Sequence, residues 1–180
     1  MIYNYEECIK IYGNHYNLVK ALEEGKLYKI ENGIYSSTKN PRDIEIFIKK
    51  HKDAVFTLQS ALYYYGISDE IPEDYVVATD KDATKYKEKN VKQYFINNNL
   101  IGIGAINIDY GGVTIPVYDK ERLLIEVIKY KNKLPFDYYK EVINYYRNHI
   151  NELNIPLLMD YLDSFPKNKL ITHIIQLEVL

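Results

Sequence analysis

The spacing of apolar residues predicts two short helices near the start of the chain. The first covers residues 5–12, with apolar side chains on one face, and ends at Gly13, a residue type that commonly ends helices. The second runs from Asn14, whose side chain can cap it, to Glu24, and Gly25 follows its end. We therefore predict two consecutive helices joined by a short turn.

A hairpin pattern follows the second helix. Apolar and polar residues alternate over residues 26–31, and the Asn32-Gly33 pair is the strongest short hairpin signal before an apolar run resumes at Ile34. Helix, turn, helix and hairpin is the order of a winged helix-turn-helix. Only four residues precede Tyr5, so we expect the module to lack its first helix. We assign residues 1–40 to this module.

The remainder of the chain, residues 41–180, shows a mixture in which most strands precede most helices. Strand patterns occur at residues 54–57, 76–79, 91–96 and 100–106 and in a hairpin around Gly111-Gly112. Helical patterns occur at residues 44–51, 58–66, 120–131, 136–150, 156–165 and 170–180. This order predicts an α+β C-terminal domain instead of an alternating α/β one.

Composition limits the kinds of binding that the chain can perform. A net charge of −2 is too low for coating nucleic acid by bulk charge, so any DNA contact must be local. The single cysteine, Cys8, cannot form an internal disulfide, and no Cys/His set has the spacing of metal ligands. No signal peptide and no membrane-spanning run is visible, so we expect a cytoplasmic protein with neither cofactor nor metal.

The second helix and the hairpin carry the candidate DNA contacts. In a helix-turn-helix the second helix presents its N-terminal side chains to base edges in the major groove, and other residues contact the backbone. The candidates are Asn14, His15, Tyr16, Asn17 and Lys20 on the helix, and Lys29 and Asn32 in the hairpin. The alternative is a protein-interaction or dimer surface. It is favoured by the equal number of Lys and Glu residues in 1–40.

A lysine-rich stretch between residues 81 and 92 is a second, weaker candidate. Its lysines include Lys81, Lys85, Lys87 and Lys89. They could contact phosphate or an acidic partner. A solvated loop whose lysines discourage strand pairing is the preferred interpretation.

Enzyme motifs are missing, and we expect no catalysis. Gly102 and Gly104 lack the third glycine and the following helix of a dinucleotide fingerprint. The acidic residues around Pro72 fall in a predicted turn, where they are ordinary surface. Arg122 and Glu126 are four residues apart on a predicted helix, and we interpret them as a structural ion pair.

Three runs of sequence together resemble a known family. They are LVKALEEGKLYKIENGIYSS at residues 18–37, SALYYYGISDEIP at 60–72 and IPVYDKERLLIEVI at 115–128. In this order and spacing they resemble the AbiEi antitoxins of bacterial type IV toxin-antitoxin, or abortive-infection, systems. The resemblance covers the chain from about Tyr5 to Val127.

The resemblance implies an autoregulator of a toxin-antitoxin operon that takes part in antiviral defence. The N-terminal winged helix would repress transcription by binding inverted repeats in its own promoter, with a homo-oligomer on the DNA. The C-terminal domain would counter a nucleotidyltransferase-like toxin, with or without direct contact. The chain departs from the family pattern at His15, Glu31 and Asn32, where arginine is frequent. An orphan homologue that keeps the fold without binding DNA is the alternative.

Overall fold

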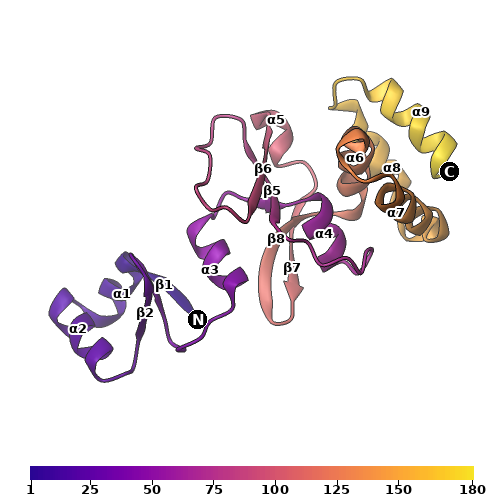
Figure 1. Cartoon of the computed structure of the whole chain (residues 1–180). Helices are drawn as coiled ribbons and strands as arrows, with labels where there is room; N and C mark the ends of the chain where they lie inside the picture. The colour runs from indigo at the N-terminus through magenta and orange to yellow at the C-terminus, as the bar shows by residue number, and fades with distance from the viewer. The chain divides into compact units, whose positions relative to one another are not determined.

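The computed structural model describes residues 1–180 and divides into two compact units, which are described separately (Figure 1). Unit 1 comprises Met1–Lys52 and unit 2 comprises Asp53–Leu180. The chain has the mixed α+β composition that the sequence predicts. None of its helices has both the length and the apolar character needed to cross a membrane.

Unit 1 contains a three-stranded antiparallel sheet and three helices. The elements are β1 (Ile2–Asn4), α1 (Tyr5–Tyr12), α2 (His15–Glu23), β2 (Tyr28–Glu31), β3 (Ile34–Ser36) and α3 (Asp43–Lys50). The sheet order is β1-β3-β2, so the first strand pairs with the last strand of the hairpin. Both predicted helices and the hairpin turn at Asn32-Gly33 are confirmed, whereas β1 was not predicted.

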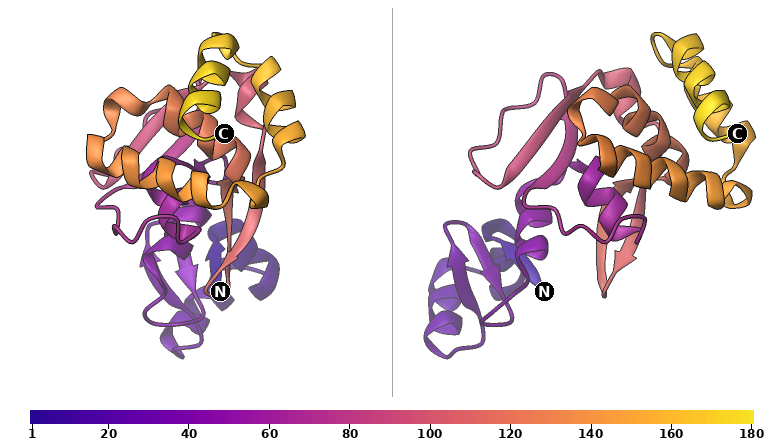
Figure 2. Two further views of the ribbon diagram at one scale, coloured as in Figure 1. Left: turned by 90° about the vertical axis from the view of Figure 1, so that its right-hand side faces the viewer. Right: turned by 45° about the vertical axis from the view of Figure 1, so that its right-hand side comes forward.

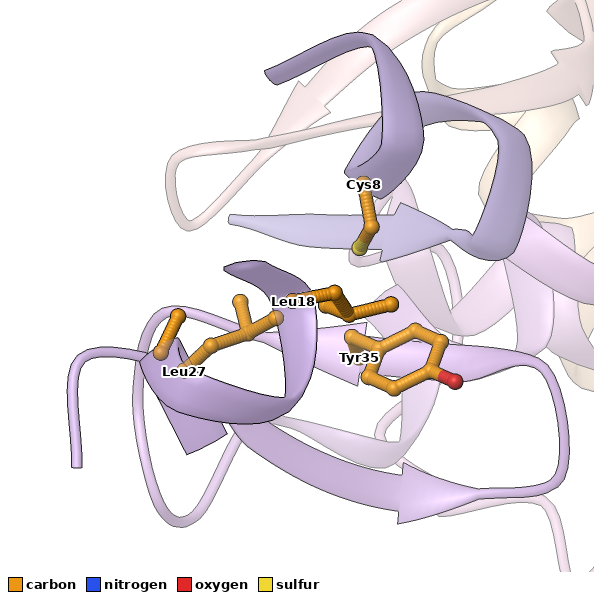
Figure 3. Packing of buried hydrophobic residues seen from close by; sticks show 5 residues of the cluster. Cys8, Leu18, Leu27 and Tyr35 are labelled. Atoms are coloured by element: carbon orange, nitrogen blue, oxygen red, sulfur yellow. The ribbon is translucent and has the colours of Figure 1, made fainter. Parts of the chain in front are cut away.

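Helices α1 and α2 pack on one face of this sheet around a small apolar core. This core contains Cys8 of α1, Leu18 and Ala21 of α2, Leu27 just before β2, and Tyr35 of β3 (Figure 3). Cys8 is a free, fully buried cysteine, and burial raises the pKa of its thiol. Cys8 therefore packs as a small apolar side chain.

The other face of the sheet is closed by α3. Successive strand residues point to opposite faces, so Ile34 lies opposite Tyr35, and both are buried. Helix α3 packs against β1. It is tied to α1 by a 2.5 Å ion pair between Lys49 and Glu7, and to the end of β2 by a 3.2 Å pair between Lys50 and Glu31.

Because of these contacts, the boundary between the two units lies later in the chain than the sequence pattern predicts. The sequence pattern assigned residues 41–180 to one domain, but unit 1 continues to Lys52 because α3 belongs to it. The polar loop at residues 37–42 is therefore a connection inside unit 1. Its composition resembles that of a linker, and only the packing of α3 shows that it is not one.

Unit 2 is built on a five-stranded mixed sheet in the order β6-β5-β4-β8-β7. The strands are β4 (Val55–Phe56), β5 (Tyr75–Asp80), β6 (Val91–Ile96), β7 (Ala105–Tyr110) and β8 (Val113–Tyr118). Strands β5 and β6 are parallel, as are β4 and β8, and the other two neighbouring pairs are antiparallel. The predicted hairpin at Gly111-Gly112 joins β7 to β8.

The helices of unit 2 gather mainly on one side of this sheet (Figure 2). They are α4 (Leu58–Tyr64), α5 (Asn98–Ile101), α6 (Lys120–Lys129), α7 (Phe136–Asn148), α8 (Ile155–Asp163) and α9 (Asn168–Glu178), with short 3-10 helices η1 (Lys131–Lys133) and η2 (Ile150–Glu152). Residues 121–128 of α6 are all buried, and α6 contacts α4, α8 and α9. Helix α6 is therefore the centre of the unit.

The predicted strand at residues 100–106 is wrong over most of its length. Residues up to Ile101 belong to α5, a turn follows, and β7 begins only at Ala105. The carbonyl oxygens of Leu100 and Ile103 accept hydrogen bonds of 2.8 and 3.0 Å from Arg122 Nη1. Arg122 therefore contacts this segment in its helix-and-turn conformation, and β7 can begin only after the turn.

Candidate DNA-binding surface

Helix α2 presents its N-terminal half to solvent. Leu18 and Ala21 point inward and are buried, whereas residues 14–17, 19 and 20 are exposed. The first turn of α2 contains no acidic residue, in contrast to α1, whose first turn carries Glu6 and Glu7. Because the N-terminus of a helix carries a partial positive charge, α2 is the helix of this pair that can accept an approaching phosphate.

Two of the candidate residues serve the local structure. The side-chain oxygen of Asn14 accepts a 2.9 Å hydrogen bond from the backbone N–H of Asn17 and so caps α2. The side-chain amide of Asn17 donates a 2.9 Å hydrogen bond to the carbonyl oxygen of Tyr12, at the end of α1. Both asparagines hold the turn between the helices, which reduces what they can offer to base edges.

His15 and Tyr16 stand at the first two positions of α2. The His15 Nδ1 atom shares a 3.4 Å hydrogen bond with the hydroxyl of Tyr5, and the two rings are 6.1 Å apart. Tyr16 is 75% exposed and makes no side-chain hydrogen bond. Tyr16 is therefore the candidate side chain with the most freedom to contact another molecule.

The lysines near the end of α2 share a carboxylate. Lys20 Nζ lies 3.9 Å from Glu24, a distance at the limit of an ion pair, whereas Lys26 contacts the same carboxylate at 2.7 Å. The hydrogen bond from Lys26 lowers the pKa of Glu24. Lys26 is the closer partner of Glu24, and the side chain of Lys20 is 62% exposed.

The hairpin adds two further candidates that do not touch the α2 set. Lys29 is exposed on β2, and Asn32 is exposed in the two-residue turn. Gly33 has a φ of +80°, a conformation that side chains other than glycine rarely adopt, so the turn is specified by its sequence. Glu31, beside the turn, is neutralised by Lys50 of α3.

The charge of unit 1 is slightly positive once α3 is included. Residues 1–52 hold nine Lys and Arg against seven Asp and Glu, a net charge of +2, whereas residues 1–40 alone are neutral. The excess is small for a DNA-binding module. A contact with DNA would therefore depend on a few well-placed groups and not on a broad basic face.

The second candidate set lies in unit 2. Lys81, Lys85, Lys87 and Lys89 are all exposed in the segment between β5 and β6, which contains neither helix nor strand. The side chain of Gln93 holds this segment by accepting a 2.9 Å hydrogen bond from the backbone N–H of Tyr86. A solvated loop beside an edge strand agrees with the preferred interpretation of this stretch.

The Arg122–Glu126 pair is confirmed as a structural element. Arg122 and Glu126 are 0% and 1% exposed, and their closest charged atoms are 2.8 Å apart. The guanidinium carbon also lies 4.3 Å from the ring centre of Tyr118 and 4.5 Å from that of Phe165. Every side of this cation is occupied by protein, so it offers nothing to a ligand.

Sequence reasoning missed a set of exposed apolar side chains on the two helices of unit 1. Tyr5 and Ile11 of α1 are 42% and 57% exposed, and Val19 of α2 is 37% exposed. Ile11 and Val19 lie off the inward stripe of their helices, and this position could have shown their exposure. Tyr5 has the spacing of an inward position, because it precedes Cys8 by three residues, so its exposure could not be predicted in this way.

Comparisons with known proteins add no relative. A scan against protein-family models gives no match, and a search of the curated proteins gives none. Within the structure, no three His, Cys, Asp or Glu side chains stand close enough to hold a metal ion.

Proposed function

We propose that unit 1 is a winged helix-turn-helix that binds promoter DNA, and that the chain is an autoregulatory antitoxin of the type IV kind. The DNA-binding proposal rests on the exposed first half of α2. A capped turn connects α2 to α1, and the β2–β3 hairpin follows α2. In this arrangement the second helix would enter the major groove and the hairpin would lie along the phosphate backbone.

The proposed contacts differ in kind. Tyr16 and His15 would meet base edges or sugars, because they occupy the start of α2 and are exposed. Lys20 and Lys29 would meet phosphates. Asn14 and Asn17 would act indirectly, by fixing the angle between α1 and α2.

The antitoxin part rests on the resemblance of three runs of sequence to AbiEi proteins. Two of these runs fall in unit 2, where they form α4 with the turn that follows it, and β8 with most of α6. Helix α4 packs against α6, and β4, which precedes α4, pairs with β8. These two runs therefore occupy neighbouring elements of unit 2, which supports their belonging to one structural unit.

A gel-shift titration of the chain's own promoter at low salt tests the DNA-binding part. We expect a shift that the double substitution Tyr16→Ala and Lys20→Ala weakens at least tenfold. Lys10→Ala, which removes an exposed lysine from α1, is the matched control and should change the affinity less than twofold. An unshifted promoter, or equal effects of the two variants, would exclude this surface.

Co-expression with a neighbouring nucleotidyltransferase-like toxin tests the antitoxin part. The chain should restore growth of cells that express the toxin, and the Tyr16→Ala, Lys20→Ala variant should do so equally well, because toxin countering is assigned to unit 2. Failure to restore growth would reject the antitoxin assignment while leaving DNA binding open.

A second candidate function, a protein-interaction module, is favoured by the exposed apolar side chains Tyr16, Val19 and Ile11. Here the face of α2 would bind a partner or a second copy of the chain. Sedimentation of the wild type and of the variant Tyr16→Ser, Val19→Ser separates the two functions. A loss of association together with an unoccupied promoter would favour the interaction module.

A further inference from the structure

Unit 2 contains a cavity of about 570 Å³ between α6, α9 and the end of β6. Its apolar floor includes Ile96, Leu100, Ile128, Phe165 and Ile171, all of which are buried. The volume falls in the range of sites that hold small organic ligands, which are largely apolar with a few polar groups at defined positions.

The charged residues at the rim of this cavity all carry the same sign. Lys129, Lys131 and Lys167 line it, and no Asp or Glu does. They come from the end of α6, from η1 and from the residue before α9, so the cationic rim is assembled from three segments. An apolar floor beneath a cationic rim complements a molecule that has an apolar body and an anionic group.

Two more lysines stand beside the rim, around a pair of tyrosines. The rings of Tyr94 and Tyr130 lie 4.7 Å apart. Lys92 Nζ is 5.7 Å from the Tyr94 ring centre, and Lys133 Nζ is 5.5 Å from that of Tyr94 and 5.1 Å from that of Tyr130. Lys129 Nζ is 4.7 Å from the Tyr130 ring centre, so the aromatic pair joins this group to the cavity.

Lys129 shares its carboxylate partner with a second cation. Glu126 is 1% exposed and lies 2.8 Å from Arg122, while Lys129 approaches it at 3.4 Å. Burial lowers the pKa of Lys129, which means that the surroundings do not fully stabilise its charge. An incoming anion would supply the charge that the protein does not.

We propose that this cavity binds a small amphipathic anion, with its apolar body on the floor formed around Phe165 and its carboxylate or phosphate at the lysine rim. The inference is independent of DNA binding by unit 1 and of the antitoxin assignment. An acidic segment of a partner protein is the competing occupant. The buried apolar floor and the modest volume favour the small molecule.

Fluorescence titration of the full-length chain with 1-anilinonaphthalene-8-sulfonate tests the proposal, because this probe is itself an aromatic anion. We expect saturable binding at one site, with decanoate and decyl phosphate displacing the probe and decanol doing so at least tenfold less well. The stronger of the two anions identifies the head group. Equal displacement by decanol, or no saturable binding, would overturn the proposal.

Charge-reversal variants locate the site. Lys131→Glu combined with Lys167→Glu should weaken binding of the probe and of decanoate at least tenfold. Lys140→Glu combined with Lys169→Glu, at exposed lysines that do not line the cavity, should leave binding within twofold. Equal losses in both pairs would show a nonspecific charge effect and refute the site.

A third variant tests the floor and the competing occupant. Ile174→Trp places a large side chain in the cavity and should abolish saturable binding of the probe, while a cooperative urea transition confirms that the variant is folded. If an acidic amphipathic peptide displaced the probe and decanoate did not, the occupant would be a protein segment and the small-molecule proposal would fail.

Discussion

Gly104 lies directly against the side chain of Arg122, and a methyl carbon placed on the glycine would be 2.5 Å from Arg122 Cβ. The same carbon would lie 3.0 Å from a carboxylate oxygen of Asp119, and the φ of Gly104 is +71°. The backbone N–H of Asp119 also donates a 2.7 Å hydrogen bond to the Gly104 carbonyl. The turn before β7 therefore fits the start of α6 only if residue 104 is a glycine.

This fit predicts that Gly104→Ala destabilises the chain by about 2 to 4 kcal/mol, because both steric overlap and an unfavourable φ must be accommodated. Gly102→Ala is the matched control, since a Cβ there meets nothing within 4 Å and its φ is −81°. Urea unfolding measures both variants. A Gly104→Ala midpoint equal to that of Gly102→Ala would contradict the packing described.

Removing one partner of the buried ion pair should be more costly than removing both. Arg122→Met leaves Glu126 buried without its main partner and should destabilise the chain by about 3 to 5 kcal/mol. The double variant Arg122→Met, Glu126→Leu should recover a large part of this loss, because no buried charge then remains. Denaturant unfolding of Arg122→Met, of Glu126→Leu and of the double variant measures the coupling between the two residues. If the destabilisation of the double variant equalled the sum of the two single effects, the pair would not interact.

The contact between α3 and α1 should weaken in acid. The hydrogen bond from Lys49 lowers the pKa of Glu7, so the folded state binds the proton less readily than the unfolded state. The stabilisation is therefore fully present above the ordinary pKa of a glutamate and is lost as the pH falls through the lowered pKa of Glu7. As a partly exposed pair it contributes about 0.2 to 1 kcal/mol.

Hydrogen exchange of the α3 amides measures this dependence. At neutral pH, Glu7→Gln should exchange faster than the wild type, and the difference should disappear in acid. Glu6→Gln, at an exposed neighbour that forms no ion pair, should match the wild type at every pH. A difference that persists in acid would assign the effect to the Asn4 capping contact instead of to the charge.

The role of Asn14 as a helix cap can be separated from a direct role in binding. Asn14→Ala should destabilise α2 by about 1 kcal/mol, whereas Asn14→Ser, which can accept the same hydrogen bond, should cost only a few tenths. If Asn14 acts only as a cap, Asn14→Ser should also bind promoter DNA as the wild type does. A loss of DNA affinity in this folded variant would show that the amide contacts DNA.

The salt dependence of DNA binding should be shallow. Lys20 and Lys29 are the two lysines of the proposed surface, so the slope of log K against log salt concentration should be about −2 for each bound protomer. Lys29→Ala should reduce its magnitude by about 1. A much steeper slope in fluorescence anisotropy titrations would show that further cations contact the DNA.

The local features of the chain follow from the sequence alone. Gly13 and Gly25 end α1 and follow α2, Asn14 and Asp119 cap their helices, and the two hairpin turns carry the residues that positive φ values require. Each is decided by neighbours within a few residues, through caps, turn conformations and helical spacing. The α+β composition follows from the same short-range signals.

Tertiary structure alone decided the features that join distant segments. The role of α3 in unit 1 depends on ion pairs to Glu7 and Glu31, and the backbone of residues 100–104 is shaped by Arg122 instead of by its own apolar pattern. The lysine rim of the cavity likewise joins α6, η1 and α9. Periodicity reports which residues are buried, but it cannot report against what they are buried, because that depends on contacts between residues far apart in the chain.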